Sequence, residues 1–342
     1  MNPAPKRRVN QSFWLRLAGT LLALALLVYL LGEQGWDEIL QAMQNIPIWQ
    51  LLLALALNLS SRIATCGRWH VLLRGARLPV RLSQTVRITF AGLFASNFLP
   101  TTIGGDVVRL AGALQLRFDG GVSAASLVAD RLVGMAGMAL ALPFGLPAFN
   151  AAFHPPHGWH TSKAILSLSA LSWDKRLEHR IKKLLRALTL FVQHMLESLK
   201  LWITRPVSLL AALGLTWGHM LCHFASIWLL LQALGDPLPF WLIAGMWSVV
   251  YFITLVPISI NGYGLQEVSL AFVFTRVGGI ALPNALSLAI LVRTLFMISS
   301  LPGAIFVPGI LAARSAAPGV NPDPVAMEDT PTERAHPRNP SG

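Results

Sequence analysis

Apolar segments recur along the 342-residue chain, and they constrain its fold more than any other feature. A helix needs about 20 apolar residues to cross the hydrocarbon core of a bilayer. Only 12% of the residues are charged, whereas soluble domains carry about 25%. The sequence therefore predicts an all-α polytopic membrane protein with about seven or eight transmembrane helices. Its apolar segments lie at about 13–31, 47–66, 88–98, 123–146, 206–234, 240–256 and 283–313.

Positive charge lies mainly between the apolar segments, where it orients a membrane protein. The chain holds 27 Lys and Arg against 15 Asp and Glu, and cytoplasmic loops are enriched in Lys and Arg. Residues 1–11 and 174–205 are basic, whereas residues 32–46 hold three acidic residues and no Lys or Arg. We therefore expect a multi-pass protein of the cytoplasmic (inner) membrane. Its N-terminus and residues 174–205 should be cytoplasmic, and residues 32–46 should be outside.

The composition also divides the chain into regions. Residues 1–11 form a short N-terminal segment, and residues 12–315 form the transmembrane domain. Apolar residues recur at helical spacing through 174–205, which predicts an amphipathic basic helix on the membrane surface or, alternatively, a solvated connector. Residues 148–162 contain Pro, His and Gly, so we expect a loop there. Residues 316–342 are rich in Pro and charged residues, which predicts a disordered tail.

Two segments interrupt their apolar runs with residues that membrane helices avoid. One extends from Asn97 to Arg109 and the other from Val256 to Glu267, and each combines Pro and Gly with an acid early in a short helical pattern. Broken backbone is tolerated in lipid only where protein or a water-filled cavity satisfies its polar groups. Paired interruptions are typical of transporters with inverted repeats. We expect non-helical, re-entrant breaks at Pro100–Gly105 and Pro257–Gly264 that approach each other, with a possible internal inverted repeat. The alternative is an ordinary loop outside the bilayer.

Charged side chains inside apolar segments cost about 2.5–3.5 kcal/mol each on insertion scales, so they are usually paired or functional. Asp130 and Arg131 lie inside one predicted span, and adjacent helical residues point about 100° apart. We therefore expect Asp130 to hold Arg109 while Arg131 faces a cavity or meets Asp106. A purely structural ion pair is the alternative for Asp130. Arg62, inside another span, is expected to be an interfacial anchor, with a substrate contact as the alternative.

The ordered motifs resemble those of the lysylphosphatidylglycerol synthase transmembrane family, also called the flippase-like domain. The motifs are Arg68-Trp69, Phe98-Leu99-Pro100 with Gly104-Gly105-Asp106 and Arg109, Asp130-Arg131, Pro257 with Asn261-Gly262 through Glu267, and Arg293. The resemblance covers roughly residues 10 to 315 and implies a bacterial or archaeal membrane protein associated with flipping lipids or lipid-linked groups. Fused members carry a synthase or glycosyltransferase domain, whereas we expect the membrane part without such a domain here. Residues 148–173 are short for the family's spanning helix.

A phosphate-bearing headgroup needs cationic donors in a low-dielectric cleft, and the forked guanidinium of Arg suits phosphate. We expect Arg87, Arg109, Arg131 and Arg293 to be buried and to supply those donors from a cavity between the two interrupted segments. Backbone amides at the glycines could add anion contacts at helix starts. The candidate lipid-binding residues are Arg87, Asn97, Gly104, Gly105, Asp106, Arg109, Asp130, Arg131, Asn261, Gly262, Glu267 and Arg293.

These residues predict a protein that binds and translocates an anionic phospholipid or a polyprenyl-phosphate-linked lipid. We expect no nucleic-acid partner, no cofactor and no metal, because Cys and His do not occur at metal-ligand spacing. One alternative is a non-transporting membrane partner of a separate glycosyltransferase or lipid synthase. The other is an intramembrane lipid-modifying enzyme with Asp106, Asp130 and Glu267 as acid/base groups. Nothing in the sequence supplies a nucleophile with an obvious base, so we expect no enzymatic activity.

Overall fold

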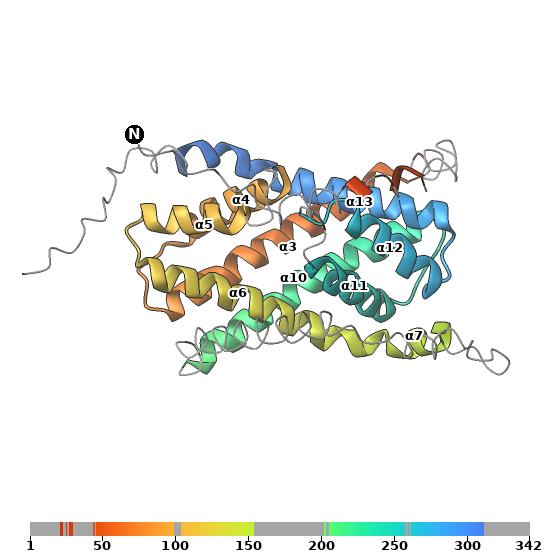
Figure 1. The fold of residues 1–342 in the computed structure, drawn as a ribbon, viewed down its shortest axis with the longest axis horizontal. Helices are drawn as coiled ribbons and strands as arrows, with labels where there is room; N and C mark the ends of the chain where they lie inside the picture. The colour runs from red at the N-terminus through yellow and green to blue at the C-terminus, as the bar shows by residue number, and fades with distance from the viewer. Residues whose placement is uncertain are drawn as a thin grey trace, which may run out of the picture.

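The computed structural model describes residues 46–98, 104–153, 205–256 and 261–310, together with 21–22, 25, 27–29, 44, 202 and 259. Within these residues every regular element is a helix (Figure 1). The elements are α3 (Ile48–Gly75), α4 (Leu82–Phe98), α5 (Gly104–Gln115), α6 (Gly120–Ala141), the 3-10 helix η1 (Leu142–Phe144), α7 (Leu146–Phe153), α10 (Pro206–Ala233), α11 (Phe240–Leu255), α12 (Leu265–Arg276), α13 (Leu282–Ser300) and the 3-10 helix η2 (Leu301–Ile305).

Four stretches of helix in the described residues are long and apolar enough to cross a membrane. They are Ile48–Gly75, Gly120–Phe144, Pro206–Ala233 and Leu282–Ile305, and α11 is a shorter apolar helix. Large apolar side chains stand exposed on their outer surfaces, and such extended apolar surface suits contact with lipid. The all-helical membrane fold predicted from the sequence is therefore confirmed. The predicted span at 13–31 lies almost entirely outside the described residues, so a total of seven or eight spans stays a prediction.

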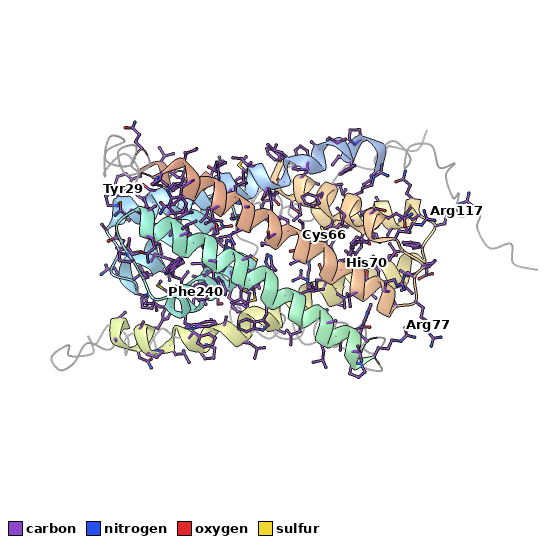
Figure 2. The ribbon with its side chains drawn as sticks, turned by 180° about the vertical axis from the view of Figure 1, so that it is seen from behind. Tyr29, Cys66, His70, Arg77, Arg117 and Phe240 are labelled. Carbon is purple, nitrogen blue, oxygen red and sulfur yellow. The ribbon has the colours of Figure 1, made fainter. Side chains whose placement is uncertain are left out.

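The long helices α3 and α10 pack against each other along the middle of the molecule (Figure 2). The amide of Asn58 on α3 donates to the hydroxyl of Ser226 on α10 at 2.9 Å, whereas Arg68, further along α3, contacts Thr216, earlier on α10. Rising residue numbers on one helix meet falling numbers on the other, so the two helices are antiparallel. Small and polar side chains at this contact allow close approach and hydrogen bonds between the helices.

The two interrupted segments differ in how they are built. Asn261, Gly262 and Gly264 adopt positive φ angles of 56°, 71° and 74° between α11 and α12, so this predicted break is confirmed in the described residues. Gly104 and Gly105, by contrast, are already helical as the first residues of α5, and the prediction of a non-helical break through Gly105 was wrong. Here glycine provides space: a Cβ at Gly105 would overlap the Ser96 hydroxyl and lie 2.7 Å from the Gly92 carbonyl on α4.

The elements follow the same order twice along the chain. The first half contains α3, α4, α5 and α6 with 28, 17, 12 and 22 residues, and the second contains α10, α11, α12 and α13 with 28, 16, 12 and 19 residues. Each last helix ends in a 3-10 turn that packs on the opposite half, η1 on α11 and η2 on α4. A Cβ at Gly245 would overlap the backbone of Gly145, and a Cβ at Gly303 would overlap the Phe90 carbonyl.

One further prediction from the sequence needs correction. Residues 148–153 were expected to begin a loop but form most of α7, because Pro147 lies in the first helical turn, where proline is tolerated, and Phe149 packs against the main core. The helix that contains the predicted span at 47–66 continues past Cys66 to Gly75. Trp69 and the leucines after it are fully buried and extend the helix. The predicted amphipathic helix at 174–205 lies almost entirely outside the described residues.

Candidate functional site

A buried carboxylate on α6 joins two arginines from different helices. Asp130 accepts hydrogen bonds from Nε of Arg68 on α3 at 2.6 Å and from Nη2 of Arg109 on α5 at 2.9 Å. Its side chain is only 3% exposed, so both guanidinium groups are needed to offset the cost of burying the charge. The expected contact between Asp130 and Arg109 is present, and Arg68 is a second partner that the sequence analysis did not assign to the site.

Aromatic and small residues position Arg109. Its guanidinium lies over the ring of Trp69 at 4.3 Å, and the Trp69 indole donates to the hydroxyl of Ser126 at 3.1 Å. A Cβ at Gly92 would lie 3.0 Å from Cδ of Arg109, so the arginine stem needs glycine at this point of α4. Stacking on tryptophan and pairing with Asp130 hold the guanidinium in one orientation.

Asp106 extends this cluster toward the surface. Its Oδ1 lies 3.5 Å from Nη1 of Arg109, and its Oδ2 lies 2.5 Å from Nη2 of Arg131. Arg131 and Asp130 point in different directions from α6, as expected, but the Arg131 side chain is 58% exposed rather than buried. Long side chains on the outer face of a helix reach outward past the packed helices. Arg131 therefore presents a partly paired guanidinium at the edge of the cluster.

A second cluster lies in the other half of the chain. Glu267 on α12 forms an ion pair with Nε of Arg293 on α13, and both side chains are largely buried. The Arg293 guanidinium lies 4.7 Å from the centre of the Tyr263 ring, and its Nη2 donates to the Gly262 carbonyl at 3.3 Å. Arg293 thus holds the break between α11 and α12 in place from α13.

The second break contacts the end of α4, where the first interrupted segment begins. The Tyr263 hydroxyl donates to the backbone carbonyl of Asn97. The side-chain amide of Asn97 donates to the Ser300 hydroxyl at 2.9 Å and to the Phe296 carbonyl at 3.2 Å. Described residues of the two interrupted segments therefore touch each other, as expected. Residues 99–103, which include Pro100, lie outside the described residues, as do Pro257 and Ile258.

The two clusters occupy corresponding places in the two halves. Asp106 and Glu267 are the third residues of α5 and α12, and Arg131 and Arg293 are the twelfth residues of α6 and α13. Each acid pairs with the arginine of the helix that follows it. The two clusters differ at Asp130. In the described second half, no carboxylate lies between two arginines as Asp130 lies between Arg68 and Arg109.

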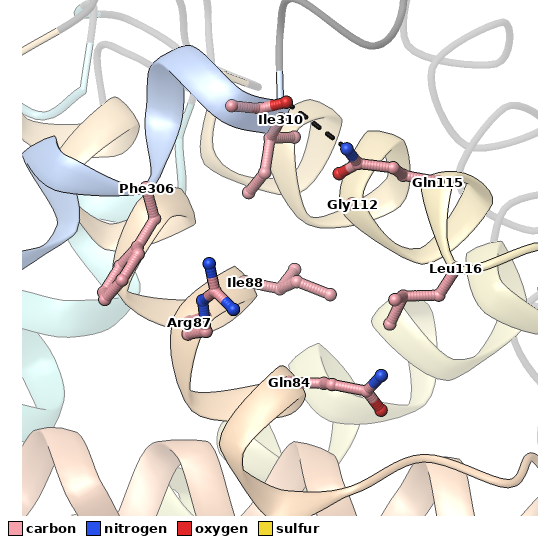
Figure 3. Close-up of a pocket in the computed structure, with 9 residues that line it drawn as sticks. Gln84, Arg87, Ile88, Gly112, Gln115, Leu116, Phe306 and Ile310 are labelled. Carbon is pink, nitrogen blue, oxygen red and sulfur yellow. Dashed lines mark hydrogen bonds between the residues drawn. The ribbon is translucent and has the colours of Figure 1, made fainter.

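Arg87 lies apart from both clusters. It lines a cavity of about 310 Å³ between α4, α5 and the residues after η2, as Figure 3 shows. Its guanidinium lies 5.3 Å from the centre of the Phe306 ring, and the nearby Gln115 side chain donates to the Gly309 carbonyl at 3.3 Å. Arg87 is exposed, so the expectation that it is buried with Arg109 was wrong. The helix face that carries it turns away from the centre of the molecule.

Polar residues at the contact of α3, α10 and α13 were not among the candidate residues. The Ser61 hydroxyl and Nδ1 of His219 are 2.6 Å apart. Nε of Arg62 donates to the Ser299 hydroxyl at 3.4 Å. His223 is 2% exposed, and neither of its ring nitrogens has a partner among the described residues. Their positions deep inside apolar segments were the signal that could have identified them.

No group of three His, Cys, Asp or Glu side chains in the described part of the chain could hold a metal ion. The helices and their buried ion pairs define a polytopic helical membrane protein. A family model described as the lysylphosphatidylglycerol synthase TM region matches residues 16–303, and the chain belongs to this family. Comparison with curated proteins gives no match.

Proposed function

We propose that this protein binds an anionic, phosphate-bearing lipid and moves its headgroup across the cytoplasmic membrane. The observation that carries the proposal is an excess of positive charge in the helix bundle and at its edge. The two clusters and Arg62 together hold five arginines (Arg62, Arg68, Arg109, Arg131 and Arg293) against three carboxylates (Asp106, Asp130 and Glu267). Uncompensated charge at membrane depth is costly, and a lipid phosphate would neutralise it.

The buried and the exposed arginines have different roles in the proposed lipid binding. Asp130 fixes Arg68 and Arg109, so these guanidinium groups create a positive potential without competing for the same carboxylate oxygen. Arg131 is paired with Asp106 yet more than half exposed, and it can exchange this carboxylate for a phosphate. A guanidinium fork binds phosphate through two parallel hydrogen bonds. Movement of a lipid by this route needs no cofactor and leaves the lipid chemically unchanged.

The correspondence between the halves supports a mechanism of alternating access. The helices α3 and α10 begin the two halves and are antiparallel, which is the arrangement of an inverted-topology repeat. Transporters with such repeats bind their substrate where the repeats meet, and broken helices line that site. Here the contact between Asn97 and Tyr263 joins the two interrupted segments at such a junction. The Lys and Arg content of residues 1–11 supports a cytoplasmic N-terminus for this transporter.

Lipid movement by purified protein tests the proposal. The protein is reconstituted into liposomes that contain phosphatidylglycerol or phosphatidylcholine labelled on the headgroup, and loss of the outer-leaflet signal is followed after adding a quencher. We expect faster movement of the labelled phosphatidylglycerol than in liposomes without protein. Arg131→Lys keeps the charge but loses the bidentate geometry, so it should slow movement about tenfold or more, given that 1.4 kcal/mol corresponds to a factor of ten.

Arg276→Lys is the matched control, because Arg276 is exposed in the last turn of α12. Both variants should insert and purify like the original protein. Equal rates for Arg131→Lys and Arg276→Lys would remove Arg131 from the site. Absence of any protein-dependent movement of either lipid would refute translocation itself.

A further inference from the structure

Arg62 lies near the middle of α3, far from either end of the helix. It is the fifteenth of the 28 residues of that helix, so about 20 Å of helix separates it from each end at a rise of 1.5 Å per residue. Arginines that serve as interfacial anchors lie near helix ends, where the guanidinium can reach the headgroups. Arg62 therefore lies away from both ends of α3, where such anchors are normally placed.

Arg62 also differs from the other arginines of the bundle in its partners. Arg68, Arg109, Arg131 and Arg293 each pair with a carboxylate. Among the described residues no carboxylate lies within 4.0 Å of Arg62. Its contacts there are the Ser299 hydroxyl, 3.4 Å from Nε, and the face of the Phe296 ring, 4.5 Å from the guanidinium carbon. Neither contact neutralises the charge.

The surroundings of Arg62 are polar on several helices. On the same turn of α3, Ser61 contacts His219. The ring of His223 lies 5.1 Å from the ring of Phe296, on which Arg62 stacks, and its two nitrogens are buried without a partner in the described protein. Buried polar groups are normally hydrogen-bonded. An arginine without a carboxylate and a histidine without a partner around one aromatic ring therefore indicate a ligand that supplies acceptors.

The position also connects to the two interrupted segments. Asn97, at the end of α4, donates to the carbonyl of Phe296 and to the hydroxyl of Ser300, which lie beside the contacts of Arg62 on α13. The Asn97 carbonyl in turn accepts from Tyr263. Arg62 and the end of α4 thus meet on one turn of α13, and the second break joins them through Asn97. This is the level at which repeat-built transporters hold their substrate.

We infer that Arg62 forms a second anion site, at mid-membrane, that takes the phosphate of a lipid headgroup during its passage. The inference rests on the proposed function. Nε stays with Ser299, and the two terminal nitrogens donate to two phosphate oxygens. Arg68 and Arg109 do not belong to this site, because both are already held by Asp130. Inorganic phosphate would present the same chemistry, so the test must separate the two sources.

Lipid binding to the purified full-length protein is measured in detergent by native mass spectrometry, with phosphatidylglycerol and phosphatidylcholine as probes. Arg62→Gln should weaken one phosphatidylglycerol site about tenfold, as expected for the loss of a charge-assisted pair of hydrogen bonds. The phosphatidylglycerol affinity of Arg62→Lys should fall between those of the original protein and Arg62→Gln. Phosphatidylcholine binding should be the same in all three proteins. Unchanged phosphatidylglycerol binding in Arg62→Gln would overturn the inference. Competition by millimolar inorganic phosphate would identify a soluble anion as the ligand, whereas its failure to compete identifies the lipid.

Thermal unfolding without added anionic lipid separates a ligand site from a structural role. Arg293→Gln is the matched control, since Arg293 has similar burial but pairs with Glu267. Arg293→Gln should unfold at a lower temperature because Glu267 is left unpaired, whereas Arg62→Gln should be at least as stable as the original protein. Loss of stability in Arg62→Gln with normal lipid binding would mean that Arg62 has a protein partner and would refute the site. If liposomes show no translocation but Arg62→Gln still loses phosphatidylglycerol, the proposed function fails and the anion site stands.

Discussion

The most direct test of the buried network is Asp130→Asn, which removes one negative charge and keeps the shape of the side chain. Asp130 is 3% exposed and holds Arg68 at 2.6 Å and Arg109 at 2.9 Å. Removing one partner of a buried ion pair costs about 3–5 kcal/mol, because the other charge is left without compensation. Two arginines lose their partner here, but Arg109 keeps Asp106 at 3.5 Å and the Asn oxygen still accepts hydrogen bonds. We therefore expect a loss of about 3 kcal/mol in the free energy of unfolding.

The assay is reversible unfolding of the purified protein in mixed micelles of a mild detergent and dodecyl sulfate, followed by circular dichroism. Asp119→Asn provides the control, because Asp119 caps the same helix by accepting from the Val122 amide at 2.7 Å. Asn is as good a helix cap as Asp, so this variant should unfold like the original protein. The two substitutions are chemically identical, and they differ in the burial of the carboxylate.

A double variant identifies the source of the loss. Asp130→Asn combined with Arg68→Met leaves one cation fewer without a partner and replaces it with an apolar side chain. Replacement of buried charges by apolar residues is often neutral or stabilising, so the double variant should recover at least about 1 kcal/mol relative to Asp130→Asn. The reasoning fails if Asp130→Asn and Asp119→Asn unfold alike, or if the double variant is the least stable of the three.

Two further predictions concern packing and orientation. Gly245→Ala should destabilise the protein by about 2 kcal/mol because its Cβ would overlap the Gly145 backbone, whereas Gly214→Ala, with no atom within 4 Å, should be neutral or slightly stabilising. Equal unfolding free energies would contradict the close packing of η1 on α11. In a variant without native cysteines, a cysteine at Glu38 should react with an impermeant reagent outside intact cells and one at Lys183 should not, because only the second segment is basic. Equal labelling of the two positions would refute the orientation.

Long apolar runs were sufficient to predict the long helices of this fold. The helices α10 and α11 begin and end within two residues of the expected positions, since Pro and Gly bound their apolar runs. Local signals also located Asn261 and Gly262 in a turn, because both can adopt positive φ angles. The role of Gly105 could not be predicted, because it depends on the distance between α5 and α4, which no local pattern records.

The acidic residues of the site could be predicted from the sequence more easily than its arginines. Asp106, Asp130 and Glu267 are rare enough in this chain that each stands out inside or beside an apolar segment. Arginines are more frequent, and an arginine near a predicted helix end looks like a normal interfacial residue. Arg87 and Arg131 were expected to be buried because they lie at the start of an apolar segment and inside one, although both are exposed. Whether a helix face points inward depends on long-range packing and not on the residues next to it.

Arg68 shows most clearly how a local pattern misleads in a membrane helix. Its charge, followed by other arginines, made α3 seem to end near Cys66. In the structure the helix continues to Gly75, and Asp130, 62 positions further along the chain, accepts from Arg68 and lowers the cost of burying its charge. A charge inside an apolar segment therefore does not mark the end of a helix where an opposite charge meets it in the fold. Arg62 lies less than two turns before Arg68 and meets no such carboxylate in the described residues, which is why we propose a ligand for Arg62.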